Sequence, residues 1–196
     1  MYKKIFLLAS LMAASNFAFA DSADSPTKFY VGAAGGYSDA NGYKEPLLTW
    51  TAYDETSMSW KFFGGYQVNE MISIEGAYNS LGKVTGTATG VGSGETTSNA
   101  WVAAVKVSPL SSSVISPFFK VGASYLSGKQ TAGGTTKKDS SAGVYYGVGI
   151  EYAISSQISA ALEYESFGKV GEASSLATNM YQIKPVAYSV ALRYKF

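Results

Sequence analysis

The sequence predicts an all-β fold, an eight-stranded antiparallel up-and-down transmembrane β-barrel over residues 29–196. Three observations lead to this prediction. Apolar residues alternate with polar or small residues in eight segments, which is the period of a β-strand. The connections between these segments are alternately short and long, as in bacterial membrane barrels. The last segment ends on an aromatic residue, Phe196.

The first 20 residues have the pattern of a cleaved signal peptide. Lys3 and Lys4 precede an apolar stretch, and Ala18-Phe19-Ala20 has the small-x-small pattern of a cleavage site. The apolar stretch is shorter than the roughly 20 residues that a membrane-spanning helix needs. We therefore expect three segments: a signal peptide at 1–20, a short polar lead at 21–28 and the barrel at 29–196.

The final alternating segment shows most clearly how the faces divide. The even-numbered positions carry apolar or aromatic residues: Val186, Tyr188, Val190, Leu192, Tyr194 and Phe196. The odd-numbered positions carry small or cationic residues: Ala187, Ser189, Ala191, Arg193 and Lys195. The same asymmetry recurs in the other seven segments, so we assign the large apolar face to lipid. An open sheet edge in hydrocarbon would leave unpaired backbone groups at several kcal/mol each. The last strand must therefore pair with the first.

The connections predict the orientation of the barrel. Short links are expected at 67–70, 109–114 and 153–157, and long loops at 38–57, 79–98, 127–140 and 167–184. Eight strands with both termini in the periplasm require three short connections and four long ones. Short periplasmic turns and long outer loops are typical of bacterial outer-membrane barrels.

Charged residues on the inward parity predict a filled lumen. They are Lys61, Glu75, Lys106, Lys120, Glu151, Glu163, Arg193 and Lys195. Because an unpaired buried charge is costly, we expect neighbouring strands to form ion pairs, namely Lys61–Glu75, Glu75–Lys106, Lys120–Glu151 and Glu163–Arg193. Arg193 is the only arginine, and its planar guanidinium suits a carboxylate in a confined site. The alternative is a narrow conduit in which these charges set ion preference.

Composition argues against several classes of chemistry. The chain has no His and no Cys, which excludes Ser-His and Cys-His catalysis and removes the usual zinc ligands. Glu163 and Glu165 share the inward face, but catalysis by paired carboxylates also needs a cleft and a substrate route. Acidic and basic residues are nearly balanced, so the chain lacks the strong positive charge that binds nucleic acid. We expect no enzyme activity, metal or cofactor.

The predicted outer loops offer two candidate contact surfaces. Trp50 and Tyr53 in the first loop and Tyr181 in the fourth are large groups where solvated loops are usually polar. They either pack against each other on strands that extend past the bilayer, or form a contact patch for a host or surface ligand. Lys129, Lys137 and Lys138 make the third loop basic, which suits either lipopolysaccharide phosphates or plain solvation.

Three motifs in order resemble a known family: Phe29-Tyr30-Val31-Gly32, Gly64-Gly65-Tyr66 and Leu192-Arg193-Tyr194-Lys195-Phe196. They are similar to the small eight-stranded outer-membrane barrels, the OmpA-like transmembrane domain and the opacity-type surface antigens. The resemblance implies a Gram-negative outer-membrane location, contact with lipid and lipopolysaccharide, and a monomer. It also implies that Tyr194 and Phe196 form an assembly signal for the barrel-assembly machinery. The peptidoglycan-binding domain of full-length OmpA-type proteins does not follow Phe196, so no wall-anchoring role is carried over.

The functional expectation is an integral outer-membrane barrel with a packed polar lumen. It contributes to envelope integrity and displays surface loops for interaction or adhesion. The alternative is a narrow porin-like channel for ions or small solutes.

Overall fold

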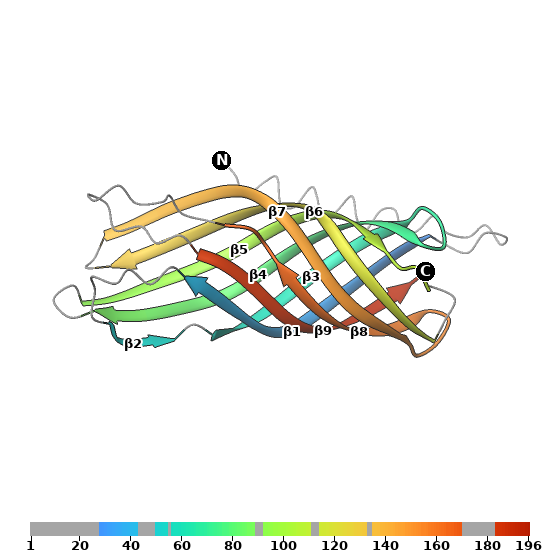
Figure 1. Ribbon diagram of the computed structural model, residues 1–196, viewed down its shortest axis with the longest axis horizontal. Coiled ribbons are helices and arrows are strands. Elements are labelled where there is room, and N and C mark those ends of the chain that lie inside the picture. The colour runs from blue at the N-terminus through green and yellow to red at the C-terminus, as the bar shows by residue number, and fades with distance from the viewer. Residues whose placement is uncertain are drawn as a thin grey trace.

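The computed structural model describes residues 28–42, 50–54, 56–88, 92–110, 114–132, 135–169 and 183–196. The regular structure in these ranges is β-strand throughout (Figure 1). Among the described residues, no helix has the length and apolar character needed to cross a membrane. The strands are β1 (Phe29–Gly42), β2 (Trp50–Asp54), β3 (Thr56–Gln67), β4 (Ile72–Ala88), β5 (Gly92–Val107), β6 (Ile115–Ala132), β7 (Thr135–Ala153), β8 (Ile158–Ser166) and β9 (Ile183–Lys195).

Eight of these strands close into an antiparallel barrel, and β2 lies outside the ring. The sheet order is β2-β4-β3-β1-β9-β8-β7-β6-β5, and an additional β4–β5 pairing joins its two ends. The first and last barrel strands pair from Tyr30 with Lys195 to Gly42 with Ile183. The predicted fold class, an eight-stranded antiparallel up-and-down barrel, is therefore confirmed.

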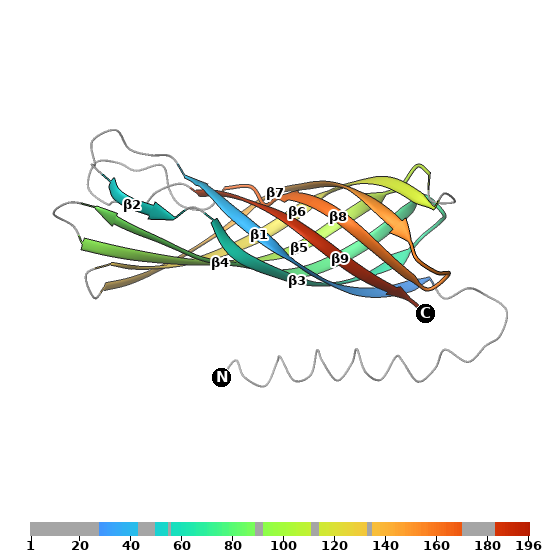
Figure 2. The same cartoon turned by 90° about the horizontal axis from the view of Figure 1, so that it is seen from below.

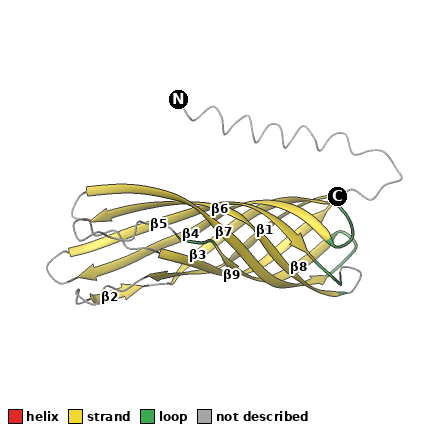
Figure 3. Cartoon of the chain, turned by 45° about the horizontal axis from the view of Figure 1, so that its top comes forward, coloured by secondary structure: helices red, strands yellow, loops and turns green. Residues whose placement is uncertain are grey.

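One end of the barrel, here called the short-turn end, carries three tight connections (Figure 3). β1 begins and β9 ends at this same end, because Tyr30 pairs with Lys195. Asn69 closes the first turn, since its side-chain oxygen accepts the backbone N–H groups of Met71 and Ile72 at 2.9 and 2.8 Å. Such local side-chain hydrogen bonds explain why Asn and Ser recur at these positions.

The opposite end, here called the hairpin end, differs from the expectation of long loops. β4 and β5 stay paired out to Ala88 and Gly92, and β6 and β7 out to Ala132 and Thr135. Residues 79–98 and 127–140, predicted as loops, are therefore mostly strand. Their Thr, Ser and Gly residues give no apolar alternation, yet Thr favours extended backbone, and the described parts of the hairpins stay paired apart from a register shift between Ser80 and Lys83.

Four consecutive strands, β4 to β7, form a curved sheet that extends beyond their neighbours (Figures 1 and 2). β5 and β6 pair as far as Gly94 and Ala132, whereas β8 ends at Ser166. β2 adds to the edge of this sheet by pairing with β4, with a register shift between Trp50 and Ala52. This short strand falls within the predicted first loop and was not foreseen.

The two faces of the barrel wall follow the predicted alternation. Outward residues such as Leu162 and Leu192 are 63% and 58% exposed, whereas inward Tyr30 and Lys120 are 2% exposed. Aromatic pairs gather on the outer face, for example Tyr78 with Trp101 and Phe29 with Tyr66, with ring centroids 4.8 and 4.9 Å apart. A continuous apolar belt of this kind would be unstable in water and suits hydrocarbon.

Large inward side chains are accommodated by glycine on adjacent strands. A Cβ at Gly32 would overlap the ring of Phe63, and one at Gly149 would overlap the ring of Phe118. Phe63 and Phe118 are buried inside the barrel together with Tyr30 and Tyr145. The lumen is consequently filled by alternating large and small side chains, as a narrow barrel requires.

Candidate functional site: the charged lumen of the barrel

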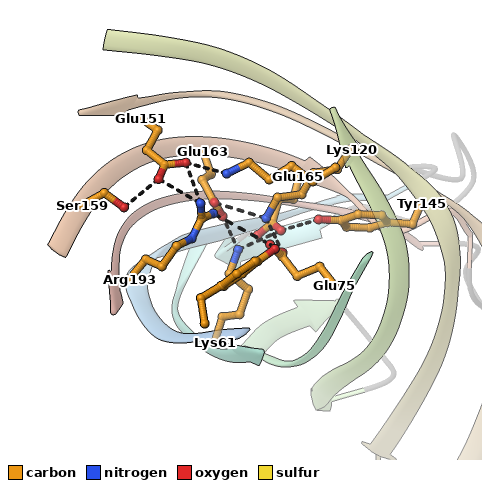
Figure 4. Close-up of polar contacts among 11 residues, drawn as sticks. Lys61, Glu75, Lys120, Tyr145, Glu151, Ser159, Glu163, Glu165 and Arg193 are labelled. Atoms are coloured by element: carbon orange, nitrogen blue, oxygen red, sulfur yellow. Dashed lines mark hydrogen bonds and ion pairs between the residues drawn. The ribbon is translucent and has the colours of Figure 1, made fainter. Parts of the chain in front are cut away.

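Eight ionisable side chains meet in the lumen formed by the described strands (Figure 4). Strands β3 to β9 supply these charged groups, and β1 adds the hydroxyl of Tyr30. All eight are buried or nearly so, in a region where charges persist only if they are paired and hydrogen-bonded. The four cations are Lys61, Lys106, Lys120 and Arg193, and the four carboxylates are Glu75, Glu151, Glu163 and Glu165.

Five of these residues, Lys61, Glu75, Lys120, Glu163 and Glu165, form what we call the inner cluster. Lys61 on β3 bridges two carboxylates of β8, Glu163 and, at 2.9 Å, Glu165. Lys120 on β6 bridges Glu75 on β4 and, at 3.2 Å, Glu163. Each lysine thus holds two carboxylates, and Glu163 is shared between both lysines.

Two buried tyrosines complete the inner cluster. The Tyr30 hydroxyl donates to Glu75 at 3.1 Å, and the Tyr145 hydroxyl donates to Glu165. The cluster has three carboxylates for two lysines, so these neutral donors stabilise the additional negative charge. The Lys61 ammonium also lies 5.1 Å from the ring centroid of Phe63, within the range of a cation–π contact.

The mouth cluster, Lys106, Glu151, Ser159 and Arg193, lies nearer the short-turn end. Arg193 Nη1 contacts the two oxygens of Glu151 at 2.8 and 2.7 Å, and Lys106 Nζ contacts Glu151 at 2.5 Å. The Ser159 hydroxyl donates to the same carboxylate at 2.6 Å. Two cations therefore share one carboxylate. A single longer contact, 3.9 Å from Arg193 Nη2 to Glu75, joins the two clusters.

The ion pairs cross the lumen, and the pairing expected between neighbouring strands is wrong. Lys61–Glu75, Glu75–Lys106, Lys120–Glu151 and Glu163–Arg193 do not form; the observed pairs are those given above. Small residues lie beside the charged ones on adjacent strands. Glu163 faces Gly149 and Ser189, and Arg193 faces Gly32 and Ser159. A long side chain with a small neighbour extends across a narrow barrel and meets the far wall.

The predicted set of lumen residues lacks three that the structure places in the inner cluster, and it includes one that lies outside both clusters. Glu165, Tyr30 and Tyr145 make hydrogen bonds in the inner cluster but were not in the predicted set, although the inward parity of all three was visible in the sequence. A tyrosine on an inward face of small residues is the signal that could have found the last two. Lys195 instead lies at the short-turn mouth and belongs to neither cluster.

A polar cavity of about 290 Å³, here called the vestibule, opens at the short-turn end. The mouth cluster forms its inner wall, and Lys195, Glu70, Gln67 and several serines complete it. Deeper in the barrel, a cavity of about 10 Å³ lies beside Lys61 and Glu165. That volume corresponds to about one water molecule. The side chains of the inner cluster thus fill the lumen beyond the inner wall of the vestibule.

The remaining predicted residues lie away from the lumen. Tyr194 and Phe196 point outward at the end of β9, with ring centroids 5.2 Å apart. Trp50 and Tyr53 belong to β2. Tyr181 lies outside the described residues. The part of the chain that the structure describes contains no group of three acidic, His or Cys side chains able to hold a metal ion.

The closed ring, the apolar exterior and the ion-paired interior define a small integral membrane β-barrel. The model of the family described as outer membrane protein beta-barrel domain matches residues 5–196. The chain therefore belongs to this family of outer-membrane barrels. No curated protein sequence matches the chain.

Solved structures share the fold at low sequence identity. Neisserial surface protein A superposes with a TM-score of 0.61 and 17% identity, covering 88% of this chain and 100% of that one. OprG from Pseudomonas aeruginosa gives 0.60 and 14%, covering 87% and 97%. Ail, the attachment invasion locus protein of Yersinia pestis, gives 0.53 and 14%, covering 86% and 99%, and has also been solved with the heparin analogue sucrose octasulfate.

Proposed function

We propose that this protein is a non-enzymatic structural barrel whose lumen is sealed and whose hairpin end is displayed at the cell surface. It contributes to envelope integrity as a monomer among outer-membrane lipid and lipopolysaccharide. Residues 1–20 are the cleaved signal peptide, and both termini face the periplasm. Tyr194 and Phe196 present the last strand to the assembly machinery. The proposal of a sealed lumen rests on the inner cluster.

The inner cluster supports a seal because its charges are mutually satisfied. Lys61 and Lys120 each bridge two carboxylates, and the adjoining cavity has about 10 Å³. An ion crossing this layer would have to separate buried pairs and meet a desolvation cost of several kcal/mol per charge. Closed packing of this kind adds stability to the wall without providing a path.

Conductance across planar bilayers tests the seal. We expect protein purified from membranes to give no reproducible open events. Lys129→Gln, at an exposed lysine near the hairpin end, is the matched control and should be equally silent. Reproducible openings that Glu75→Gln or Glu163→Gln alter would instead establish the alternative, a narrow porin-like channel. The vestibule favours that alternative, because it already admits solvent to the mouth cluster.

The hairpin end supports a role in surface contact. Lys129 on β6 and Lys138 on β7 are cross-strand partners and both are exposed. Two adjacent ammonium groups suit a polyanion, such as lipopolysaccharide phosphates or a sulfated glycan. Ail, which shares the fold, has been crystallised with a sulfated ligand. Trp50 and Tyr53 on β2 remain candidates for an apolar contact, as does Tyr181, which lies outside the described residues.

Retention of cells on heparin-coupled resin tests this surface. We expect Lys129→Gln with Lys138→Gln to lower the eluting salt concentration, because two exposed charges are lost. Lys83→Gln, which removes an exposed lysine paired with Glu95, is the control. Equal retention of the double variant and the parent would contradict polyanion binding by this pair.

A further inference from the structure

We propose that the vestibule is a binding site for a small oxyanion, a carboxylate or a phosphate group, held between Arg193 and Lys195. The vestibule lies at the short-turn end and has room for such a group, with about 290 Å³. Its inner wall is the mouth cluster, and its rim includes Lys195. This assignment holds whether or not the inner cluster conducts ions.

The first support is an unsatisfied donor on Arg193. This side chain is 7% exposed, and its Nη1 is committed to Glu151. Its Nε is buried and has no hydrogen-bond partner among the described residues. A buried N–H of a charged group without an acceptor bears the full desolvation penalty of that group. Arg193 lines the vestibule, so its guanidinium charge acts on an anion there, while the enclosed Nε reports that anion through a change in its surroundings.

The second support is the charge of the vestibule wall. Lys106 and Arg193 share the single carboxylate of Glu151, so the mouth cluster retains one positive charge. Lys195 adds a second positive charge, and the exposed Glu70 on the opposite turn is the only other acid lining the cavity. The inner cluster has the opposite imbalance, with three carboxylates and two lysines. The lumen is therefore polarised, with its positive side toward the vestibule.

The third support is the set of neutral donors around the cavity. Ser108, Ser155 and Ser156 line it with their hydroxyl groups, and Gln67 and Gln157 contribute amides. Glu151 is already saturated by four hydrogen bonds from Lys106, Arg193 and Ser159. The hydroxyl and amide groups can donate or accept hydrogen bonds, so the positive charge of the wall decides the sign of the ligand. A carboxylate or phosphate, which only accepts hydrogen bonds when ionised, matches this wall better than a cation or an apolar group does.

A single NMR resonance can report on this site. Arg193 is the only arginine in the chain, so protein labelled with ¹⁵N-arginine has one side-chain Nε–H signal. The protein is purified from membranes in a non-ionic detergent and titrated with inorganic phosphate or with acetate, using chloride at matched ionic strength as the reference. We expect a saturable shift with at least one of the two anions and none with chloride. The two arms distinguish a phosphate group from a carboxylate as the preferred ligand.

Two variants locate the anion. Lys195→Gln removes a cation that belongs to neither cluster, so the barrel should stay folded, and affinity should fall about fivefold, the upper range for an exposed ion pair. Lys184→Gln, at an exposed lysine of β9 near the hairpin end, should leave affinity unchanged. The proposal would be overturned by an Nε shift that stays linear to about 100 mM with both anions, or by one that Lys195→Gln and Lys184→Gln weaken equally.

Discussion

The inner cluster and the mouth cluster both pair buried cations with glutamates, but they differ in charge balance and surroundings. The inner cluster has three carboxylates for two lysines, and Tyr30 and Tyr145 supply the missing donors. The mouth cluster has two cations for one carboxylate and borders a cavity of about 290 Å³. Buried ion pairs seal a lumen where every charged group has a protein partner. Where a charged group lacks a protein partner, that group stays available to a ligand or to solvent.

Removing a lysine from the inner cluster should have the largest effect. Lys120→Met leaves Glu75 and Glu163 without their shared cation in a site that water does not reach. We expect a loss of about 3–5 kcal/mol in the free energy of unfolding, measured by urea titration in detergent micelles. Lys129→Met on the same strand is exposed and should change stability by less than about 0.5 kcal/mol. Equal stability of the two variants would remove the basis for a sealed inner layer.

Breaking the mouth cluster should have an intermediate effect. Glu151→Gln leaves Lys106 without a carboxylate and Arg193 with only its 3.9 Å contact to Glu75, but both cations border the vestibule, where solvent compensates in part. We expect a loss of about 1.5–3 kcal/mol in the free energy of unfolding, as for hydrogen bonds to charged groups. Glu70→Gln, in an exposed turn, serves as the control. A loss as large as that of Lys120→Met would show that the two clusters are equally shielded.

The smallest of the three effects should come from the tyrosines of the inner cluster. Tyr145→Phe keeps the ring and its packing on Phe167 but removes the donor to Glu165. We expect a loss of about 1–2 kcal/mol in the free energy of unfolding. The adjacent residue, Tyr146, points outward, so Tyr146→Phe should be close to neutral. If both variants unfold at the same urea concentration, the hydroxyl of Tyr145 does not compensate the negative charge.

The wall of the barrel was predictable from the sequence because strand alternation is a local property. Each residue's neighbours two positions away already determine its face, and the inward parity of Lys61 and Arg193 followed directly. The ion-pair partners were not predictable, because they depend on how strands tilt and stagger around the closed ring. Lys61 and Glu163 are 102 residues apart. The continuation of β4–β7 past the lipid-facing belt was also missed, since polar strands lack the apolar signal.

The position of Arg193 on β9 has a consequence for how the protein is made. Arg193, the fourth cation of the lumen, arrives on the final strand, and Lys61 on β3 meets its partners Glu163 and Glu165 only when β8 is in place. A partly assembled sheet therefore presents uncompensated charges on its concave side. We expect that side to stay hydrated until the first and last strands join. Closure then neutralises the interior in one event, so the charged lumen favours the complete barrel over any intermediate with an open seam.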